Sequence, residues 1–152
     1  MGNALYHTGG IRRGGSHRRR IAVGYCPVTN QQLNKDGEAI DVASLLEAFD
    51  NNRRLLAQII ELFLRDLPAK IARLHAAVAT GDEREIFTAI HTITGSVGML
   101  WRGNAYDAAL ALERDAQRGA VGNAGARSIE IEYQLTRLAS ALDSILTDLR
   151  AQ

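Results

Sequence analysis

Apolar residues recur at helical spacing along most of this chain, from Asp41 to its last residues. Steps of three and four place them on one face of a helix, and the alternation of apolar and polar residues that marks strands is absent. Polar, glycine or proline residues interrupt the pattern at points where helices begin or end. The pattern predicts helices over about 41–49, 52–66, 68–80, 82–100, 106–118 and 126–150.

These segments predict an all-α fold, because several helices joined by short loops favour antiparallel neighbours. We expect an antiparallel four-helix bundle with an additional short N-terminal helix and a long C-terminal helix. Asn52 and Asp82 are suited to cap the helices that follow them, and Gly81 to end the helix before it. Pro68 fits the first turn of a helix, where its missing N–H does no harm. The long last helix has room to pack on its own bundle or on a second subunit, and the sequence leaves both open.

Residues 1–40 lack the helical pattern and differ in charge from the rest of the chain. They contain six Lys/Arg and two Asp/Glu, a net charge of +4, whereas residues 41–152 contain twelve and fifteen, a net charge of −3. The stretch GGIRRGGSHRRR has no apolar face to bury, which predicts a flexible basic tail or linker over 1–40 and a helical domain over 41–152. The alternative is a basic arm for nucleic acid or anionic lipid.

Composition narrows the classes of function. The predicted domain is mildly acidic, so we expect no nucleic-acid partner. No run of about 18 uncharged apolar residues is present, so we expect no membrane insertion. The single Cys26 excludes an internal disulfide, and a reducing, cytoplasmic setting fits it. No histidines or carboxylates have ligand spacing in a suitable context, so no metal site is predicted.

The stretch AIHTITGSVGML (89–100) holds the most informative residues of the chain. Its apolar stripe includes Ile90, so the next residue, His91, lies about 100° away from the buried face. The helical neighbours of His91 are Phe87, Thr88, Thr94 and Gly95, three of which are small. Ser96 and Gly98 extend the small surface. Each glycine costs about 1 kcal/mol relative to alanine inside a helix, so the presence of two glycines here needs an explanation. One explanation is access for a partner to His91, and the other is close packing against a neighbouring helix.

An accessible histidine on a rigid helix is suited to phosphoryl transfer. Imidazole is largely neutral and nucleophilic near pH 7, and the small surroundings admit a partner's active site. Most of the catalysis of such a transfer is positioning and charge stabilisation, which a partner with Mg²⁺ can supply. The competing explanation is an ordinary surface histidine, which is how we interpret His75 in the preceding helix.

The stretch IHTITGSVGML resembles the active helix of histidine-containing phosphotransfer domains, which runs His-x-Leu-Lys-Gly-Ser. His91 matches the phosphorylated histidine, and Ile93, Gly95 and Ser96 match the aliphatic, glycine and serine positions. Phe63 and the Gly-Asp turn upstream, and ALALERDAQRG downstream, are similar to the family's flanking helices. The resemblance covers about residues 41–118.

The resemblance implies a phosphorelay intermediate in two-component signal transduction. His91 would accept a phosphoryl group from a response-regulator receiver aspartate and pass it on, with Mg²⁺ supplied by the receiver and no cofactor of its own. Receiver domains and a histidine kinase are the implied partners, and the C-terminal end of a hybrid sensor kinase is one implied setting. The module would have no catalytic machinery of its own. The implied partner-binding residues are Phe87, Thr88, Thr94, Gly95, Ser96 and Gly98.

One position departs from the family pattern. Thr94 stands where the family usually has the lysine that neutralises the phosphoryl group, and a hydroxyl brings no positive charge. Arg84, two turns before His91, and Arg102, just after the helix, are the candidates to compensate. The alternative function is an interaction-only bundle that binds a receiver or another protein without phosphotransfer.

Overall fold

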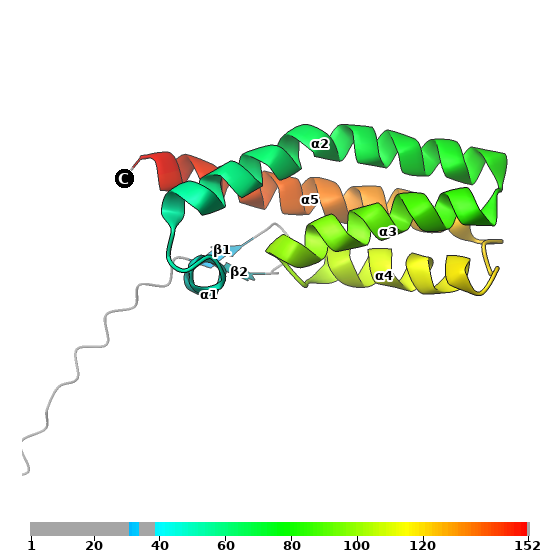
Figure 1. The fold of residues 1–152 in the computed structure, drawn as a ribbon, viewed down its shortest axis with the longest axis horizontal. Helices are drawn as coiled ribbons and strands as arrows, with labels where there is room; N and C mark the ends of the chain where they lie inside the picture. The colour runs from blue at the N-terminus through cyan, green and yellow to red at the C-terminus, as the bar shows by residue number, and fades with distance from the viewer. Residues whose placement is uncertain (1–30, 34–38, 152) are drawn as a thin grey trace, which may run out of the picture.

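The computed structural model describes residues 31–33 and 39–151, and nearly all of them lie in helices. The all-α prediction is confirmed. Two short strands precede a short helix and four long ones (Figure 1). In chain order the elements are β1 (Gln31–Leu33), β2 (Ala39–Asp41), α1 (Val42–Ala48), α2 (Arg53–Thr80), α3 (Glu83–Leu100), α4 (Asn104–Gln117) and α5 (Ala124–Arg150).

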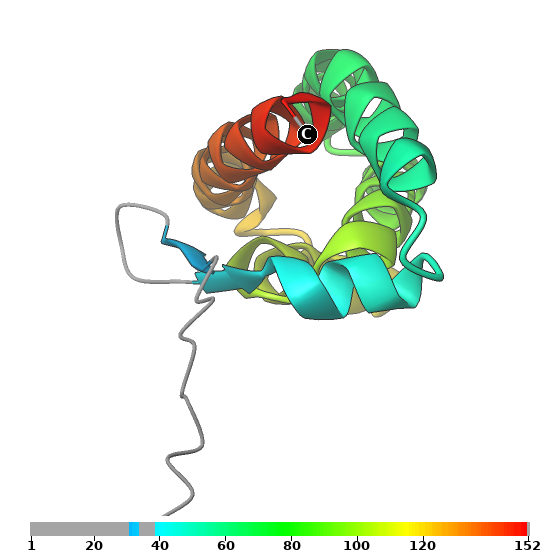
Figure 2. The ribbon, with the colours of Figure 1, turned by 90° about the vertical axis from the view of Figure 1, so that its left-hand side faces the viewer.

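The four long helices form the bundle, and α1 lies at one end of it. Helix α2 packs against α3 and α5, and α4 packs against the same two helices, so α3 and α5 occupy diagonal corners (Figure 2). Each long helix turns one apolar face to the centre, which removes that face from water and supplies the main stabilisation. The largest fully buried side chains of this core are Ile40, Leu56, Ile60, Leu74, Ile86, Ile90, Ile93, Leu112, Ile131, Leu135, Leu142 and Ile145.

The predicted caps are present at the helix ends. The side chain of Asn52 accepts a hydrogen bond from the Leu55 N–H, and Asp82 accepts from the N–H groups of Arg84 and Glu85. Gly81 ends α2 with φ +70°, a conformation that glycine adopts without strain. These caps satisfy donors that the helix itself cannot pair.

Asp41 adds a cap that the sequence analysis did not name. Its carboxylate accepts hydrogen bonds from the Ser44 hydroxyl and from the N–H groups of Ala43 and Ser44 at the start of α1. The Ser44 hydroxyl and then the Ser44 N–H hold the pKa of Asp41 below its usual value, because both stabilise the ionised form.

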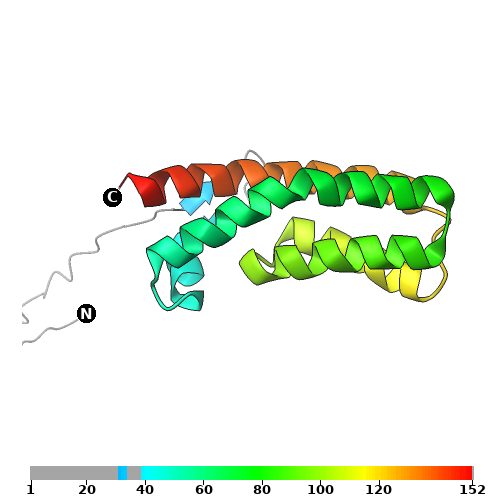
Figure 3. The same ribbon diagram turned by 45° about the horizontal axis from the view of Figure 1, so that its top comes forward.

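The predicted break at Pro68 is wrong, because Pro68 lies inside α2, a single helix of 28 residues. A proline inside a helix removes one hydrogen bond and costs about 3 kcal/mol. The buried positions before and after Pro68 nevertheless keep one helical period, so core packing on both sides offsets that cost. Figure 3 shows α2 changing direction along its length, as expected of a helix that contains proline. The buried positions are Leu56, Ile60, Phe63, Leu67, Leu74 and Ala77.

All of the two strands except Asp41 lies within the range 1–40 that was predicted to be a tail. They pair antiparallel, with Gln31 opposite Asp41 and Leu33 opposite Ala39, and β1 lies against α5. Ile40 is only 1% exposed and belongs to the core, so the folded unit begins before Asp41. Residues 1–30 and 34–38 lie outside the described residues, and the tail stays a prediction for them.

Candidate functional site

His91 lies midway along α3 and is exposed, as its position beside the apolar stripe predicted. Its side chain is 66% exposed, whereas its chain neighbour Ile90 is fully buried. The buried face of α3 holds the helix in place and leaves the imidazole on the surface of a rigid element. A partner can therefore reach the ring without any opening of the bundle.

Glu113 of α4 binds the His91 ring. The distance between His91 Nδ1 and Glu113 Oε1 is 2.8 Å. An ionised carboxylate only accepts hydrogen bonds, so Nδ1 is the donor, and in the neutral ring Nε2 then keeps its lone pair. The Glu113 side chain is 16% exposed, and its Oε2 is buried with no hydrogen-bond partner among the described residues. The carboxylate is thus partly buried beside the ring, in a position where it would attract any positive charge that the imidazole acquires.

A second contact comes from Phe87, one turn before His91 on the same helix. The two rings stack with centroids 5.6 Å apart and an interplanar angle of 16°. Together with the Glu113 hydrogen bond, this stacking restricts rotation of the imidazole. Because the ring is already fixed, less conformational entropy is lost when a partner and the imidazole reach the geometry for reaction.

The two glycines after His91 serve different purposes. A Cβ on Gly95 would meet nothing within 4 Å, so this position is open and adjoins the ring by one helical turn. A Cβ on Gly98 would lie 2.7 Å from Cε2 of Tyr106, closer than atoms can pack. Gly95 therefore fits the access explanation, and Gly98 is explained by the close packing of α3 on α4.

The hydroxyl residues of α3 bond mainly to their own helix. Thr94 is only 6% exposed, which corrects the expectation that it lies on an open surface, and its hydroxyl donates to the carbonyl of Ile90. The reason is its angle: position 94 falls on the side of α3 that faces α4. Thr88 and Ser96 also donate to carbonyls of α3, those of Arg84 and Thr92.

Arg84, Lys70 and Arg102 are cations on or beside α3, and within the described part of the chain none of them bonds to His91. Arg84 is exposed in the first turn, about 10 Å before His91 along the axis. Helical side chains lean towards the N-terminus of their helix, so the Arg84 side chain is directed away from the His91 ring. Lys70 of α2 donates to Ser96 Oγ at 2.8 Å. The Arg102 guanidinium lies 5.4 Å from the centroid of the Tyr106 ring, a cation–π contact.

A surface groove connects His91 with Arg102. It has a volume of about 410 Å³ and runs between α3 and α4. Most of the residues that line it are apolar or small. Its charged or titratable lining residues are Glu113, His91 and Arg102. The groove is the natural place for a partner's side chain beside the imidazole. Its lining residues are His91, Thr94, Gly95, Gly98, Met99, Arg102, Tyr106, Leu110 and Glu113.

The sequence analysis did not assign a role to Glu113 or Tyr106. Glu113 lies 22 residues after His91, and this separation becomes a contact only because α3 and α4 are antiparallel. The sequence did contain a signal, the Leu112-Glu113 pair in the helix that resembles the family. Tyr106 left no such signal, because its contact with Gly98 depends on the distance between two helices.

Comparison with known proteins identifies the family of this chain. The family model for the Hpt domain matches residues 58–152, which is more than half of the chain and contains His91 and Glu113. The chain therefore belongs to the Hpt domain family, whose members act in the phosphorelays of two-component signalling. No curated protein and no solved structure matched the chain. Among the described residues, no helix is long and apolar enough to cross a lipid bilayer.

Proposed function

We propose that His91 is the phosphoacceptor of a relay that takes a phosphoryl group from a receiver aspartate and passes it to another receiver. The observation that carries this proposal is the exposed imidazole whose Nδ1 is held by Glu113 at 2.8 Å. This contact leaves Nε2, the nitrogen farther from the backbone, with a free lone pair. An exposed imidazole on a rigid helix, bonded through Nδ1 and not through Nε2, is the geometry that an in-line transfer requires.

The transfer uses few groups of this chain. The Nε2 lone pair attacks phosphorus, an N–P bond forms, and the bond between phosphorus and the aspartyl oxygen breaks, which leaves a carboxylate on the receiver. The proton on Nδ1 stays in place, so the phosphorylated ring carries a positive charge. Glu113 stabilises that charge through its hydrogen bond. The reverse sequence returns the phosphoryl group to a receiver.

The phosphoryl oxygens need positive charge that position 94 does not provide. Thr94 is buried and its hydroxyl is bound to Ile90, so it brings neither charge nor a free donor. We infer that the receiver supplies most of the neutralisation, because it brings the Mg²⁺ of the reaction. Among the described residues, Arg102 is the cation that lines the groove with His91, so it is well placed to assist.

The receiver would dock on the groove side of α3. Met99 is 52% exposed and Leu110 lines the same groove, so both offer apolar surface beside His91. The open space above Gly95 lets the partner's loops approach the imidazole. We place this relay in the cytoplasm, with a histidine kinase upstream, and the C-terminal module of a hybrid sensor kinase is one arrangement that fits. The domain needs no catalytic machinery of its own in this scheme.

Transfer of label tests the proposal. A receiver phosphorylated with ³²P should label the wild-type protein, the label should be acid-labile, and His91→Gln should remove it. His91→Gln should still bind the receiver, which shows that the variant is folded. A wild-type protein that binds receivers but takes label from none of them would refute the relay.

An interaction-only bundle is the second function, and Thr94 favours it because the usual lysine is missing. Such a protein would bind a receiver or another protein through the same groove without taking label. Binding that is unchanged in His91→Gln, together with no labelling of the wild type, would identify this alternative.

A further inference from the structure

The outer face of α5 carries the two most exposed large apolar side chains of the described residues. Ile129 is 66% exposed and Tyr133 is 53% exposed. They are four residues apart, so they lie next to each other on one side of the helix. Because they are adjacent, they form a small apolar patch rather than two scattered surface residues.

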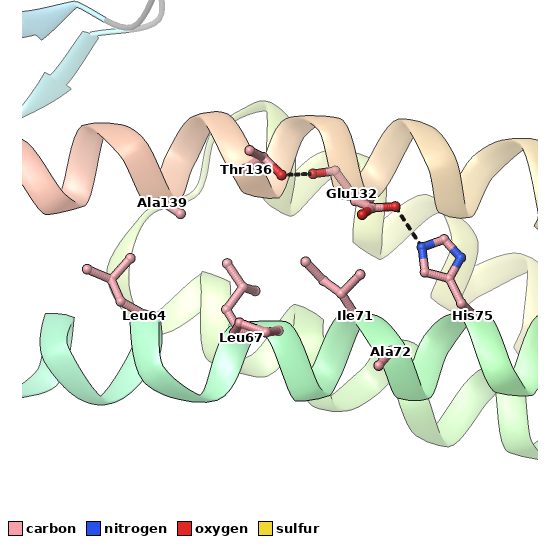
Figure 4. A pocket seen from close by; sticks show the side chains of 9 residues that line it. Leu64, Leu67, Ile71, Ala72, His75, Glu132, Thr136 and Ala139 are labelled. Carbon is pink, nitrogen blue, oxygen red and sulfur yellow. Dashed lines mark hydrogen bonds and ion pairs between the residues drawn. The ribbon is translucent and has the colours of Figure 1, made fainter.

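An apolar groove adjoins these two side chains. It runs between α2 and α5, has a volume of about 480 Å³ and ends at a hydrogen bond of 2.7 Å between His75 Nε2 and Glu132 Oε2 (Figure 4). Thr136, which lines the groove, is one turn after Tyr133 and two turns after Ile129. One face of the molecule thus offers both protruding and recessed apolar surface. The groove is lined by Leu64, Leu67, Pro68, Ile71, Ala72, His75, Glu132, Thr136 and Ala139.

We propose that this face binds a second copy of the chain, with the two α5 helices antiparallel about a two-fold axis between Tyr133 and Gln134. In this register Ile129 of each copy lies opposite the segment between Thr136 and Ala139 of the other, at the edge of the apolar groove. Tyr133 of one copy lies beside Tyr133 of the other. A face that holds both features is self-complementary, as a two-fold interface requires.

Charge supports the same register. Glu130 and Arg137 are seven residues apart and lie on the same side of α5, two turns from each other. They are equally far from the proposed axis, so Glu130 of each copy faces Arg137 of the other. The Arg137 guanidinium lies 5.4 Å from the centroid of the Tyr133 ring and donates to its hydroxyl at 3.1 Å. This contact orders an arginine and a tyrosine, residue types that often dominate interfaces.

The size of the face is adequate for a dimer. Helices α2 and α5 have 28 and 27 residues, so each is about 40 Å long. Helix α5 alone, about 10 Å in diameter, presents about 400 Å², and α2 beside it about the same again, so a dimer that buries the standard area of about 800 Å² per partner uses the α2 side of the groove as well as α5. Because α3 is diagonal to α5 in the bundle, His91 would stay accessible in both copies (Figure 2).

Sedimentation equilibrium of the full chain tests this proposal independently of phosphotransfer. The wild type should show twice the monomer mass at high concentration and dissociate on dilution. Ile129→Glu should weaken association about tenfold or more, because a charge replaces a central apolar contact. Met99→Glu, an equally polar change on α3, is the matched control and should leave association unchanged. Circular dichroism should show that both variants keep their helical content.

Charge reversal tests the register. Glu130→Arg places arginine opposite arginine, and Arg137→Glu places glutamate opposite glutamate, so each variant alone should be weaker than wild type. An equimolar mixture of the two should form a heterodimer, because every facing pair then has opposite charges. A wild type that stays monomeric up to about 1 mM, the weakest class of specific affinity, would overturn the proposal. A dimer that Ile129→Glu leaves intact would overturn it as well.

Discussion

Two histidines of this bundle are paired with glutamates of the neighbouring helix, and only one of the two pairs suits phosphotransfer. His91 binds Glu113 through Nδ1 and is 66% exposed, whereas His75 binds Glu132 through Nε2 and is 38% exposed. The nitrogen that stays free is therefore Nε2 in His91 and Nδ1 in His75. Nδ1 is the nitrogen nearer to the backbone, so a partner reaches it less easily.

The surroundings of the two rings differ in the same direction. His91 is followed one turn later by Gly95, which leaves open space. His75 closes a groove whose walls include Leu67 and Ile71. A histidine beside a carboxylate is therefore not sufficient for the proposed reaction. The nitrogen that the carboxylate binds, and the bulk on the adjacent turn, make the difference between the two sites.

The largest expected effect comes from removing each histidine in turn. His91→Gln should abolish labelling by a phosphorylated receiver, because it removes the nucleophile. His75→Gln should be labelled at the wild-type rate, since only a surface hydrogen bond to Glu132 is lost. Quench-flow labelling measures both rates. An equal loss of labelling in the two variants would contradict the claim that only His91 suits phosphotransfer.

The glutamates give the next largest effect. Glu113→Ala should slow transfer to and from His91 about ten- to a hundred-fold. This factor corresponds to the free energy that a hydrogen bond to a charged group contributes. Glu132→Ala is the matched control and should leave transfer unchanged. The imidazole ¹⁵N shifts of His91 should also change in Glu113→Ala, which reports the tautomer directly. An unaltered rate in Glu113→Ala would remove Glu113 from the account.

The two glycines of α3 should respond in opposite directions. Gly98→Ala should lower the free energy of unfolding by about 1–3 kcal/mol, because the new methyl meets the Tyr106 ring at 2.7 Å. Gly95→Ala should raise it by up to about 1 kcal/mol, because alanine favours the helix and meets nothing. Urea unfolding of both variants measures the difference. If both lose stability alike, the assignment of Gly95 to access and Gly98 to packing fails.

The smallest effect is expected at position 94. Thr94→Lys should lengthen the lifetime of the phosphohistidine a few-fold, because the long stem can follow the groove wall while the ammonium reaches the phosphoryl oxygens. Replacing a buried threonine should also cost about 1 kcal/mol of stability. The decay of label at neutral pH measures the lifetime. An unchanged lifetime would indicate that another cation already serves, and Arg102→Ala would then shorten it.

The sequence was sufficient for every helix boundary except the break predicted at Pro68, to within a few residues, and for the position of His91. Helix caps and periodic apolar residues are local signals, so Asn52, Gly81 and Asp82 were identified correctly from their neighbours alone. Pro68 misled the prediction for a physical reason. The local preference against proline was visible in the sequence, but the packing of Leu67 and Leu74 that outweighs it was not.

The candidate site was predictable only in part, because half of it comes from another helix. The angle of His91 on α3 follows from the helical period, whereas its contact with Glu113 depends on how α4 packs against α3. The same packing buries Thr94 and brings Tyr106 onto Gly98. Distances between helices are properties of the whole core, so no local pattern carried them.

Nuclear magnetic resonance of the phosphorylated protein tests the central claim most directly. After reaction of ¹⁵N-labelled protein with a phosphorylated receiver, a ³¹P–¹⁵N correlation identifies the nitrogen bonded to phosphorus. The account predicts one correlation, to Nε2 of His91, while Nδ1 keeps its proton. A correlation to Nδ1 of His91 or to either nitrogen of His75 would contradict it.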